Sequence, residues 1–316
     1  MSPRRVLVTG GAGFIGSHVC EAYLSEGWDV TALDDLSTGR RDNVPGGVEL
    51  VELDVRSPDV SDLFRTRRFD VVNHHAAQID VRTSVARPRY DASINIDGLL
   101  ALLEAAVATD VRRFVFISSG GVVYGEPTEL PVPRGAPKRP LSPYGVSKLA
   151  SEYYLNAFHS LHGLEYVALR YSNVYGPRQD PHGEAGVVAI FSQRIRDGKP
   201  LTVFGDGGQT RDYVYVKDVA AANVLATRAQ LPAPESLDDV AFNVGTGSET
   251  SVNELAGTLI AISGRDIPIE YAQARAGELR RNALDCRETR ALGWTPAHGL
   301  EDGLRATFES IAGVVT

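Results

Sequence analysis

Residues 9–17 read Thr-Gly-Gly-Ala-Gly-Phe-Ile-Gly-Ser and follow a short apolar run. Gly10, Gly13 and Gly16 are spaced three residues apart, and residues 14–26 have a helical pattern. A glycine turn between a strand and a helix lets the backbone approach a pyrophosphate, whose negative charge the helix N-terminus then faces. The pattern also fits an ordinary turn, but its place between strand and helix favours a phosphate-binding loop.

The first half of the chain alternates apolar runs with helical patterns. We expect strands at residues 6–9, 30–33, 48–51, 70–73, 114–117 and 166–169, and helices that include 89–108 and 144–162. Strands that alternate with helices pair in parallel through right-handed crossovers. The alternation therefore predicts an α/β fold with a Rossmann-type doubly wound parallel sheet.

The rhythm changes after about residue 177, where prolines and glycines mark irregular chain. Residues 187–197 and 252–263 still have helical patterns. We therefore expect a cofactor-binding Rossmann domain and a smaller α/β substrate-binding domain. Their expected bounds are 1–178 and most of 179–316, with segments near 211–224 and 241–248 as candidates to return to the first domain.

Composition excludes several classes of protein. The 316 residues include 32 Lys and Arg against 40 Asp and Glu, a net charge of −8 that argues against a nucleic-acid binder. Cys20 and Cys286 are too few for a disulfide framework and suggest a reducing compartment. There is no run of 18 apolar residues and no signal-peptide pattern, so we expect a cytoplasmic protein without a membrane segment. We expect no metal site, because the adjacent His74 and His75 would point to opposite faces of a strand.

Two carboxylates follow the second and third expected strands. Asp34 lies 18 residues after Gly16. A carboxylate at that place accepts hydrogen bonds from an adenosine ribose diol and repels a 2′-phosphate, which favours NAD over NADP. Asp54 follows the third strand and is a candidate for binding the adenine amino group.

Tyr144 and Lys148 lie near the start of an expected helix, and their spacing of four places them on one helix face. A neighbouring ammonium and a positively charged nicotinamide both favour a phenolate. Lowering the pKa of a phenol by three units needs about 4 kcal/mol. We predict a tyrosinate that takes a proton from an alcohol near neutral pH. The same spacing also occurs in ordinary amphipathic helices.

Together these residues resemble the extended short-chain dehydrogenase/reductase superfamily and, within it, the UDP-glucose (UDP-hexose) 4-epimerase family. The family-like segments are residues 9–18, 34–39, 74–78, 95, 118–125, 144–148, 170–177, 205–218, 243–247 and 275–278. The resemblance implies NAD as the cofactor, a UDP-sugar as the substrate and a homodimer that pairs through helices 89–108 and 144–162.

The resemblance also implies roles for single residues. The residues implied for the adenosine diphosphate half of NAD are Gly10, Gly13, Phe14, Ile15, Gly16, Asp34 and Asp54. Those implied for the cofactor cleft are Ala76, Ala77, Gln78 and Asn95, with Lys148 on the nicotinamide ribose. Those implied for the UDP-sugar are Asn173, Val187, Thr202, Phe204, Arg211, Arg275 and Glu278. Two arginines can clamp a diphosphate, and an aromatic ring can pack against uracil.

One loop departs from the family pattern. A Ser or Thr usually stands four residues before the tyrosine of a Val-Tyr-Gly segment, but Gly120 stands there in this chain. Ser119 lies 25 residues before Tyr144, so we expect Ser119 to contact the sugar 4-oxygen, with Ser118 as the alternative. Related dehydratases and decarboxylases carry an acid just after this hydroxyl. Glycine in that place favours plain oxidation and re-reduction at C4.

The resemblance thus implies NAD-dependent 4-epimerisation of a UDP-hexose through a transient 4-keto intermediate. Tyr144 and Lys148 would be catalytic, together with Ser119 or Ser118. Asn282 stands where side-chain bulk limits room for a 2-N-acetyl group in the family, so we expect N-acetylhexosamines to be accepted as well. The alternatives are another nucleotide-sugar epimerase, such as a UDP-uronate 4-epimerase, and an NAD-binding sensor that has lost catalysis.

Overall fold

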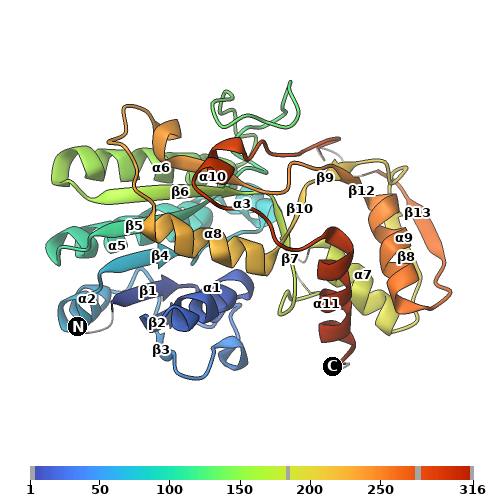
Figure 1. Cartoon of the computed structure of the whole chain (residues 1–316), viewed down its shortest axis with the longest axis horizontal. Helices are drawn as coiled ribbons and strands as arrows, with labels where there is room; N and C mark the ends of the chain where they lie inside the picture. Colours follow the sequence, from blue (N-terminus) through green and yellow to red (C-terminus); the bar gives the residue numbers. More distant parts are fainter. Residues whose placement is uncertain (1–3, 183–185, 275–278, 314–316) are drawn as a thin grey trace. The chain divides into compact units, whose positions relative to one another are not determined.

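The computed structural model describes residues 4–182, 186–274 and 279–313 (Figure 1). The chain forms two compact units and passes between them several times. Unit 1 consists of residues 1–125, 135–171 and 220–242, and unit 2 of residues 126–134, 172–219 and 243–316. The expectation that residues 1–178 bind the cofactor and most of 179–316 bind the sugar concerns function, so it stays a prediction.

A seven-stranded sheet organises unit 1. Its strands are β1 (Arg5–Thr9), β2 (Asp29–Asp34), β3 (Glu49–Glu52), β4 (Val71–His74), β5 (Arg113–Ser119), β6 (Glu165–Tyr171) and β11 (Ala241–Val244), in the order β11-β6-β5-β4-β1-β2-β3. All pairs from β6 to β3 are parallel, which confirms the predicted doubly wound sheet. The strand order reverses between β1 and β4, and ligands of such sheets bind beyond the carboxyl ends of the strands at that point.

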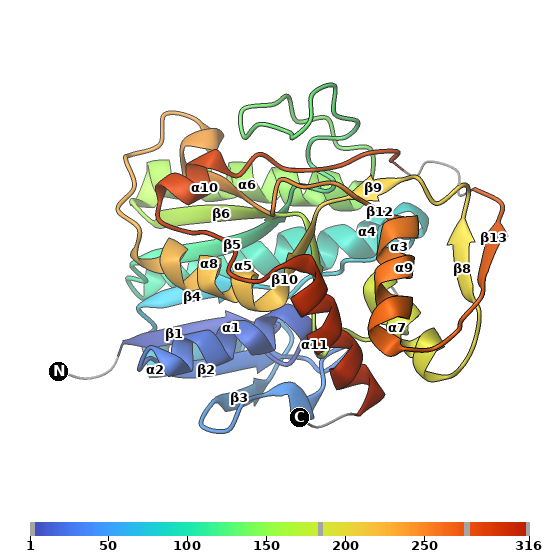
Figure 2. The ribbon, with the colours of Figure 1, turned by 45° about the vertical axis from the view of Figure 1, so that its right-hand side comes forward.

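Helices cover both faces of this sheet (Figure 2). The helices that lie wholly or mostly in unit 1 are α1 (Phe14–Ser25), α2 (Val60–Arg67), α3 (Val81–Ala86), α4 (Pro88–Ala92), α5 (Gly98–Ala108), α6 (Pro143–His162) and α8 (Val216–Arg228), with the short turns η1 (Arg41–Asn43) and η3 (Leu237–Val240). On one face α2, α5 and α6 bury an apolar core that includes Phe64, Leu102, Phe114 and Leu155. Burial of such side chains is the main driving force for folding of the unit.

Polar contacts join the helices on the opposite face. Tyr23 of α1 shares a hydrogen bond of 2.5 Å with Thr227 of α8 and accepts one of 2.9 Å from Asn73 of β4. Asn223 of α8 accepts from Asn73 at 3.1 Å and donates to the hydroxyl of Tyr171 at 2.6 Å. These hydrogen bonds join α1, β4, β6 and α8, although the Oδ1 atom of Asn73 is buried without a partner.

The helix expected at 89–108 is interrupted. A π-helical turn, η2 (Ser93–Asp97), separates α4 from α5. A π-turn widens the helix by one residue and commonly occurs at functional sites. This turn carries Asn95, whose amide reaches Asp91 one turn earlier and the backbone of Gln78 after β4.

Unit 2 contains three small two-stranded sheets, in which β7 pairs with β10, β8 with β13 and β9 with β12. The strands are β7 (Asn173–Tyr175), β8 (Leu201–Phe204), β9 (Thr210–Arg211), β10 (Tyr213–Tyr215), β12 (Thr250–Ser251) and β13 (Ile269–Ala272). The helices α7 (Val187–Arg196) and α9 (Val252–Ser263) confirm the two expected in this region; α10 (Arg287–Ala291) and α11 (Leu300–Ala312) follow. In the part of the chain that the structure describes, no helix has the length and apolar character needed to cross a membrane.

One buried carboxylate holds several segments of unit 2 together. Asp212, between β9 and β10, accepts hydrogen bonds from the backbone N–H of Thr246, Gly247 and Leu284 at 2.8–3.2 Å. The hydroxyl of Thr246 donates a fourth at 2.7 Å. The side chain is fully buried, so water cannot replace it as the acceptor for these groups.

We expect Asp212→Ala to destabilise the protein by about 3 kcal/mol or more, because three backbone N–H groups would lose their acceptor at about 1–3 kcal/mol each. The melting midpoint should fall by several degrees. Asp206→Ala is the matched control, since Asp206 forms an exposed ion pair with Arg280. Equal melting midpoints for the two variants would contradict this assignment.

Candidate active site

The glycine turn predicted to bind phosphate lies at the reversal of the sheet order. Gly10 has φ of +68°, and a Cβ atom there would lie 2.8 Å from the backbone nitrogen of Ala76 after β4. A Cβ on Gly16 would collide with the carbonyl oxygen of Gly10. No side chain caps the start of α1, whose N-cap residue is Gly13. A tight turn that leads into an uncapped helix N-terminus suits a phosphate ligand.

Asp34 ends β2 and is almost fully buried. Its carboxylate accepts from the N–H groups of Ala12 at 3.0 Å and Leu36 at 2.9 Å, so it also ties β2 to the glycine turn. Burial raises the pKa of Asp34, and these backbone donors oppose the rise. A Cβ on Gly39 would lie 2.5 Å from the carboxylate, which explains the glycine there.

Asp54 has a different environment from Asp34. The guanidinium of Arg56 grips its carboxylate with contacts of 2.9 and 2.5 Å, and this hydrogen bonding lowers the pKa of Asp54. Its predicted contact with adenine stays a prediction.

Residues 76–78, predicted to line the cofactor cleft, follow β4 beside the glycine turn. Thr9 at the end of β1 accepts there from the N–H groups of His75 at 3.0 Å and Ala76 at 3.2 Å. The amide of Asn95 both accepts from and donates to the backbone of Gln78 at 2.9 Å. Asn95 thus shapes this segment as well as lying near it.

His74 and His75, which directly precede residues 76–78, both have pKa values below the ordinary value of a histidine. His74 shares a hydrogen bond of 2.7 Å with the Thr9 hydroxyl, and burial holds its pKa well below the usual range. Burial, and secondly Lys148, lower the pKa of His75 to about 3. The Nε2 atom of His75 is buried and has no hydrogen-bond partner. An unpartnered polar atom beside the glycine turn fits a site that a polar ligand completes.

Tyr144 and Lys148 lie together on α6, as predicted from their spacing. Ser142 caps this helix by accepting from the N–H of Gly145 at 3.2 Å. The Lys148 Nζ atom lies 5.8 Å from the centre of the Tyr144 ring. It donates a 2.8 Å hydrogen bond to the carbonyl oxygen of Ile117 on β5. This contact holds a buried ammonium beside the phenol.

The charge balance of this pair differs from our expectation. Burial lowers the pKa of Lys148 to about 8, while Asp91 and Glu152 act to raise it. Burial, and secondly Asp91, raise the pKa of Tyr144 above its ordinary value of 10. We expected Lys148 and a nicotinamide cation to lower it. With the chain's own groups alone the direction is the opposite, because burial and the Asp91 carboxylate both raise the pKa of Tyr144.

The two candidate serines end β5 and have different surroundings. Ser118 is buried, and its hydroxyl donates a 2.6 Å hydrogen bond to Glu152 of α6. Ser119, the next residue along the strand, is partly exposed. Ser118 therefore already has a hydrogen-bond partner within unit 1.

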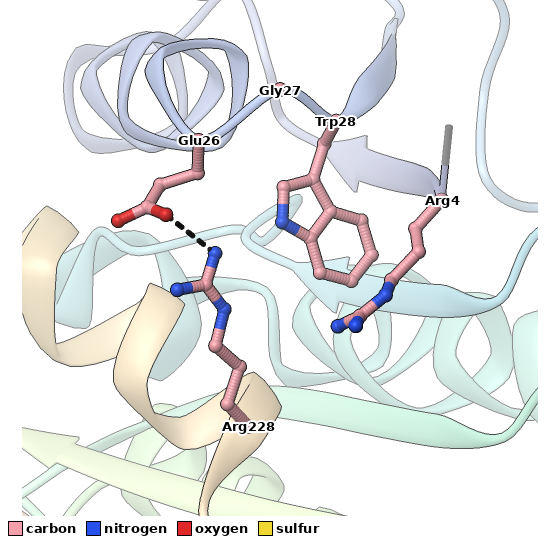
Figure 3. Close-up of a pocket in the computed structure, with 5 residues that line it drawn as sticks. All are labelled: Arg4, Glu26, Gly27, Trp28 and Arg228. Carbon is pink, nitrogen blue, oxygen red and sulfur yellow. Dashed lines mark hydrogen bonds and ion pairs between the residues drawn. The ribbon is translucent and has the colours of Figure 1, made fainter. Parts of the chain in front are cut away.

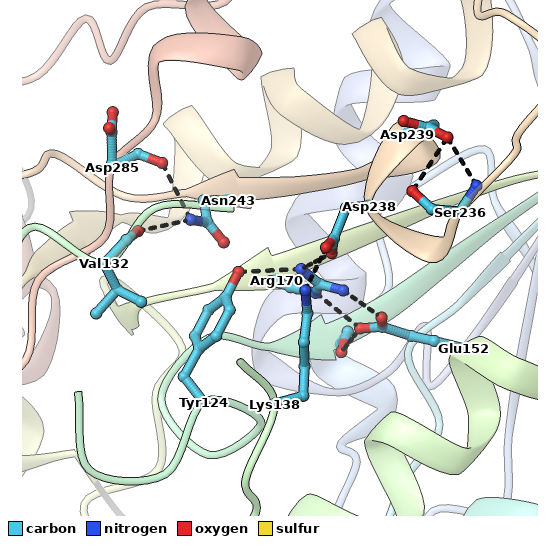
Figure 4. Close-up of polar contacts among 11 residues, drawn as sticks. Tyr124, Val132, Lys138, Glu152, Arg170, Ser236, Asp238, Asp239, Asn243 and Asp285 are labelled. Atoms are coloured by element: carbon cyan, nitrogen blue, oxygen red, sulfur yellow. Dashed lines mark hydrogen bonds and ion pairs between the residues drawn. The ribbon is translucent and has the colours of Figure 1, made fainter. Parts of the chain in front are cut away.

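A polar network that sequence reasoning missed surrounds Glu152 (Figure 4). Arg170 of β6 is fully buried and grips Glu152 through contacts of 3.0 and 2.6 Å. The same guanidinium donates to the Tyr124 hydroxyl at 3.0 Å and to Asp238 at 2.8 Å. Asp238 also pairs with Lys138. The only sequence signal was that Arg170 and Tyr124 belong to family-like segments.

The predicted UDP-sugar residues lie in unit 2. Asn173 is exposed on β7, Val187 begins α7, and Thr202, Phe204 and Arg211 are half-buried on β8 and β9. Thr202 and Phe204 share one face of β8, since alternate residues of a strand point the same way. Asn282 is buried, and neither polar atom of its amide has a partner. Arg275 and Glu278 lie outside the described residues.

A separate hollow of about 420 Å³ lies beside the amino-terminal ends of β1 and β2 (Figure 3). Its lining residues precede β1 and β2 or end α1 and α8: Arg4, Glu26, Gly27, Trp28 and Arg228. Arg228 forms a 2.7 Å ion pair with Glu26, and the Arg4 guanidinium lies 5.5 Å from the centre of the Trp28 ring. The hollow lies at the amino ends of the strands, whereas the candidate site lies at their carboxyl ends.

Comparisons with known proteins show which family the chain is similar to. Residues 6–245 match the family described as "NAD dependent epimerase/dehydratase family". A UDP-glucose 4-epimerase from Mycolicibacterium smegmatis is 44% identical over 96% of this chain and 97% of that protein. The UDP-glucose 4-epimerase of Thermotoga maritima, solved with UDP-glucose, superposes with a TM-score of 0.93 at 43% identity over 98% of this chain and 99% of that one.

The UDP-glucose 4-epimerase of Thermus thermophilus, solved in complex with NAD, gives a TM-score of 0.91 at 44% identity, over 98% of this chain and all of that one. With the glycine turn, Asp34 and the Tyr144–Lys148 pair in place, the chain belongs to the NAD-dependent epimerase/dehydratase family.

Proposed function

We propose that this protein catalyses the NAD-dependent 4-epimerisation of a UDP-hexose, with UDP-glucose and UDP-galactose as its substrate pair. The observation that carries the proposal is the close placement of Lys148 and Tyr144: the Lys148 ammonium lies 5.8 Å from the centre of the Tyr144 ring. Both residues lie on a helix that packs against the sheet, and the glycine turn of the same unit has no room for a side chain. Relatives of nearly the same length with this activity support it.

Each part of the site has a role in this reaction. The glycine turn and Asp34 would hold the adenosine diphosphate half of NAD, and residues 76–78 would line its cleft. Bound NAD would supply the hydride acceptor and donor for the sugar C4. Tyr144 takes the proton of the 4-hydroxyl group and later returns it. Lys148 stabilises the phenolate while the proton is absent.

Ser119 is the hydroxyl that we assign to the sugar 4-oxygen, in preference to Ser118. The hydroxyl of Ser118 is already bonded to Glu152 in the interior. Gly120 and Gly121 follow Ser119, so this loop offers no carboxylate for the extra acid–base step of a dehydratase. This supports simple epimerisation.

In unit 2 we assign the uridine diphosphate to the residues named from the family resemblance. We assign Asn282 to the sugar, because its buried amide keeps donor and acceptor atoms without partners. Such a side chain is small enough to leave room for a 2-N-acetyl group. We therefore include UDP-N-acetylhexosamines among the substrates.

Tyr144→Phe should lower turnover about 10²- to 10⁴-fold, because it removes the group that transfers the proton. The content of bound NAD should not change, since the glycine turn is intact. Tyr153→Phe is the matched control, because Tyr153 is exposed on the same helix. Wild-type turnover in Tyr144→Phe would refute the assignment of the base.

Asn282→Tyr should abolish conversion of UDP-N-acetylgalactosamine and retain conversion of UDP-galactose, because the larger ring fills the space of the N-acetyl group. The measurement is chromatographic separation of the 4-epimers after incubation without added cofactor. If both substrates lose or keep activity equally, Asn282 does not select the sugar.

We also propose a homodimer that forms through one face of unit 1. Exposed apolar side chains gather on α3, α4 and α6, namely Val85, Tyr90, Val146, Tyr153 and Leu161. The three helices pack against one another. A soluble chain rarely leaves an apolar face of this kind uncovered, and a second copy covers it symmetrically.

Light scattering after size exclusion should give a mass twice that of the 34.0 kDa chain. The double variant Tyr153→Glu/Leu161→Glu should elute as a monomer, because two charges would be buried against an apolar face. Tyr271→Glu, at an exposed position in unit 2, should remain dimeric. A dimeric double variant would place the interface elsewhere.

A further inference from the structure

Asp91 on α4 is a fully buried carboxylate to which sequence reasoning assigned no role. Its Oδ2 atom accepts a 2.6 Å hydrogen bond from Ser147 of α6. Its Oδ1 atom accepts from the amides of Gln78 and Asn95, both at 3.0 Å. Asp91 therefore joins three segments around the candidate site: the chain after β4, the π-turn and the helix of Tyr144.

All three donors to Asp91 are neutral. Among the described residues, Asp91 takes part in no ion pair, which is costly for a buried charge. Lys148 also lacks an ion-pair partner. It is buried, and within the described chain its ammonium donates to a carbonyl oxygen and to no carboxylate. Ser147, whose hydroxyl donates to Asp91, directly precedes Lys148 on α6, so this hydrogen bond ties Asp91 to the turn of the helix that carries Lys148. Of the two carboxylates that act on Lys148, Asp91 has the larger effect.

The other titratable groups that face Lys148 do not balance its charge. His74 and His75 come from the β4 side and are neutral, because burial lowers the pKa of both. Tyr144 lies on the same helix, and burial raises the pKa of its phenol. Glu152, also on α6, is held by the buried Arg170 (Figure 4). The Phe116 ring of β5, 4.9 Å from the ammonium, carries no charge.

We propose that Asp91 is the buried counter-charge of Lys148 and a positioning residue for the proposed epimerase reaction: its hydrogen bonds hold α6 and Asn95 in place, and its negative charge offsets the positive charge of Lys148. The inference rests on the proposed function only for its catalytic consequence. The electrostatic pairing of Asp91 with Lys148 can be tested without any substrate.

The catalytic consequence concerns the range of pH. The active form needs Tyr144 without its proton and Lys148 with one. Burial brings the pKa of Lys148 down to about 8, and Asp91 opposes this fall. Asp91 also raises the pKa of Tyr144. The Asp91 carboxylate therefore moves both the lower and the upper pH limit of activity toward higher pH.

Asp91→Asn tests this directly, since it removes the charge and can keep all three contacts. The remaining oxygen can accept from Gln78 and Asn95, and the new amide can donate to the Ser147 hydroxyl. Both edges of the kcat/KM profile should move to lower pH, by about one unit. Ser147→Ala is the control, because it removes a hydrogen bond and keeps the charge; its profile should not move. An unmoved profile in Asp91→Asn would overturn the inference.

A second measurement uses thermal stability and no substrate. We compare the effect of Asp91→Asn on the melting midpoint in the wild-type chain and in Lys148→Met. Near pH 6.5 the substitution should lower the midpoint more in the wild-type background, where Lys148 is charged. The difference should disappear well above pH 8, where Lys148 loses its proton. Equal effects in both backgrounds at every pH would overturn the pairing.

The two measurements separate the two proposals. If the wild-type protein converts no UDP-hexose, the proposed function fails and the thermal comparison alone decides the role of Asp91. If the wild-type protein is active but Asp91→Asn leaves the pH profile and the thermal difference unmoved, only this inference fails.

Discussion

Glu152 of α6 and Arg170 of β6 form a buried ion pair with two hydrogen bonds, of 3.0 and 2.6 Å. Removing both charges from water is costly, and the cost is offset only when the remaining donors and acceptors are satisfied. Ser118, Tyr124 and Asp238 supply those partners. A shift of α6 by one residue would leave both charges buried without partners. The ion pair therefore sets the register of α6 against the sheet.

That register positions the residues proposed to be catalytic, because α6 carries them on one face. Tyr144, Lys148 and Glu152 are each four residues apart and so lie along a single stripe of the helix. Glu152 anchors the stripe, Lys148 reaches the end of β5, and Tyr144 lies nearest the start of the helix. Asp91 holds the same helix from α4 through Ser147. Glu152 thus anchors the helix, while a different carboxylate, Asp91, is the one proposed to balance the charge of Lys148.

The sequence was sufficient for features that depend on local pattern. Apolar runs and glycine spacing predicted the six strands and the β1–α1 turn, and a spacing of four predicted the pairing of Tyr144 with Lys148. Contacts between distant residues were beyond reach. Asp91 and Ser147 are 56 residues apart, and Asp212 and Leu284 are 72 apart. Nothing local distinguishes such an aspartate from one in a surface turn. The π-turn likewise has no pattern that separates it from an α-helix.

The sequence alone does not decide between Ser118 and Ser119, because the decision depends on how the two side chains pack. Neighbouring residues of a strand point in different directions, so the two hydroxyls have different surroundings. The sequence names the pair but does not state which face is covered. Glu152 provides that information, because its carboxylate accepts from Ser118 and is itself held by Arg170. The ion pair that holds the helix thereby occupies Ser118, and this contact supports the proposal that Ser119 is the hydroxyl that meets the substrate.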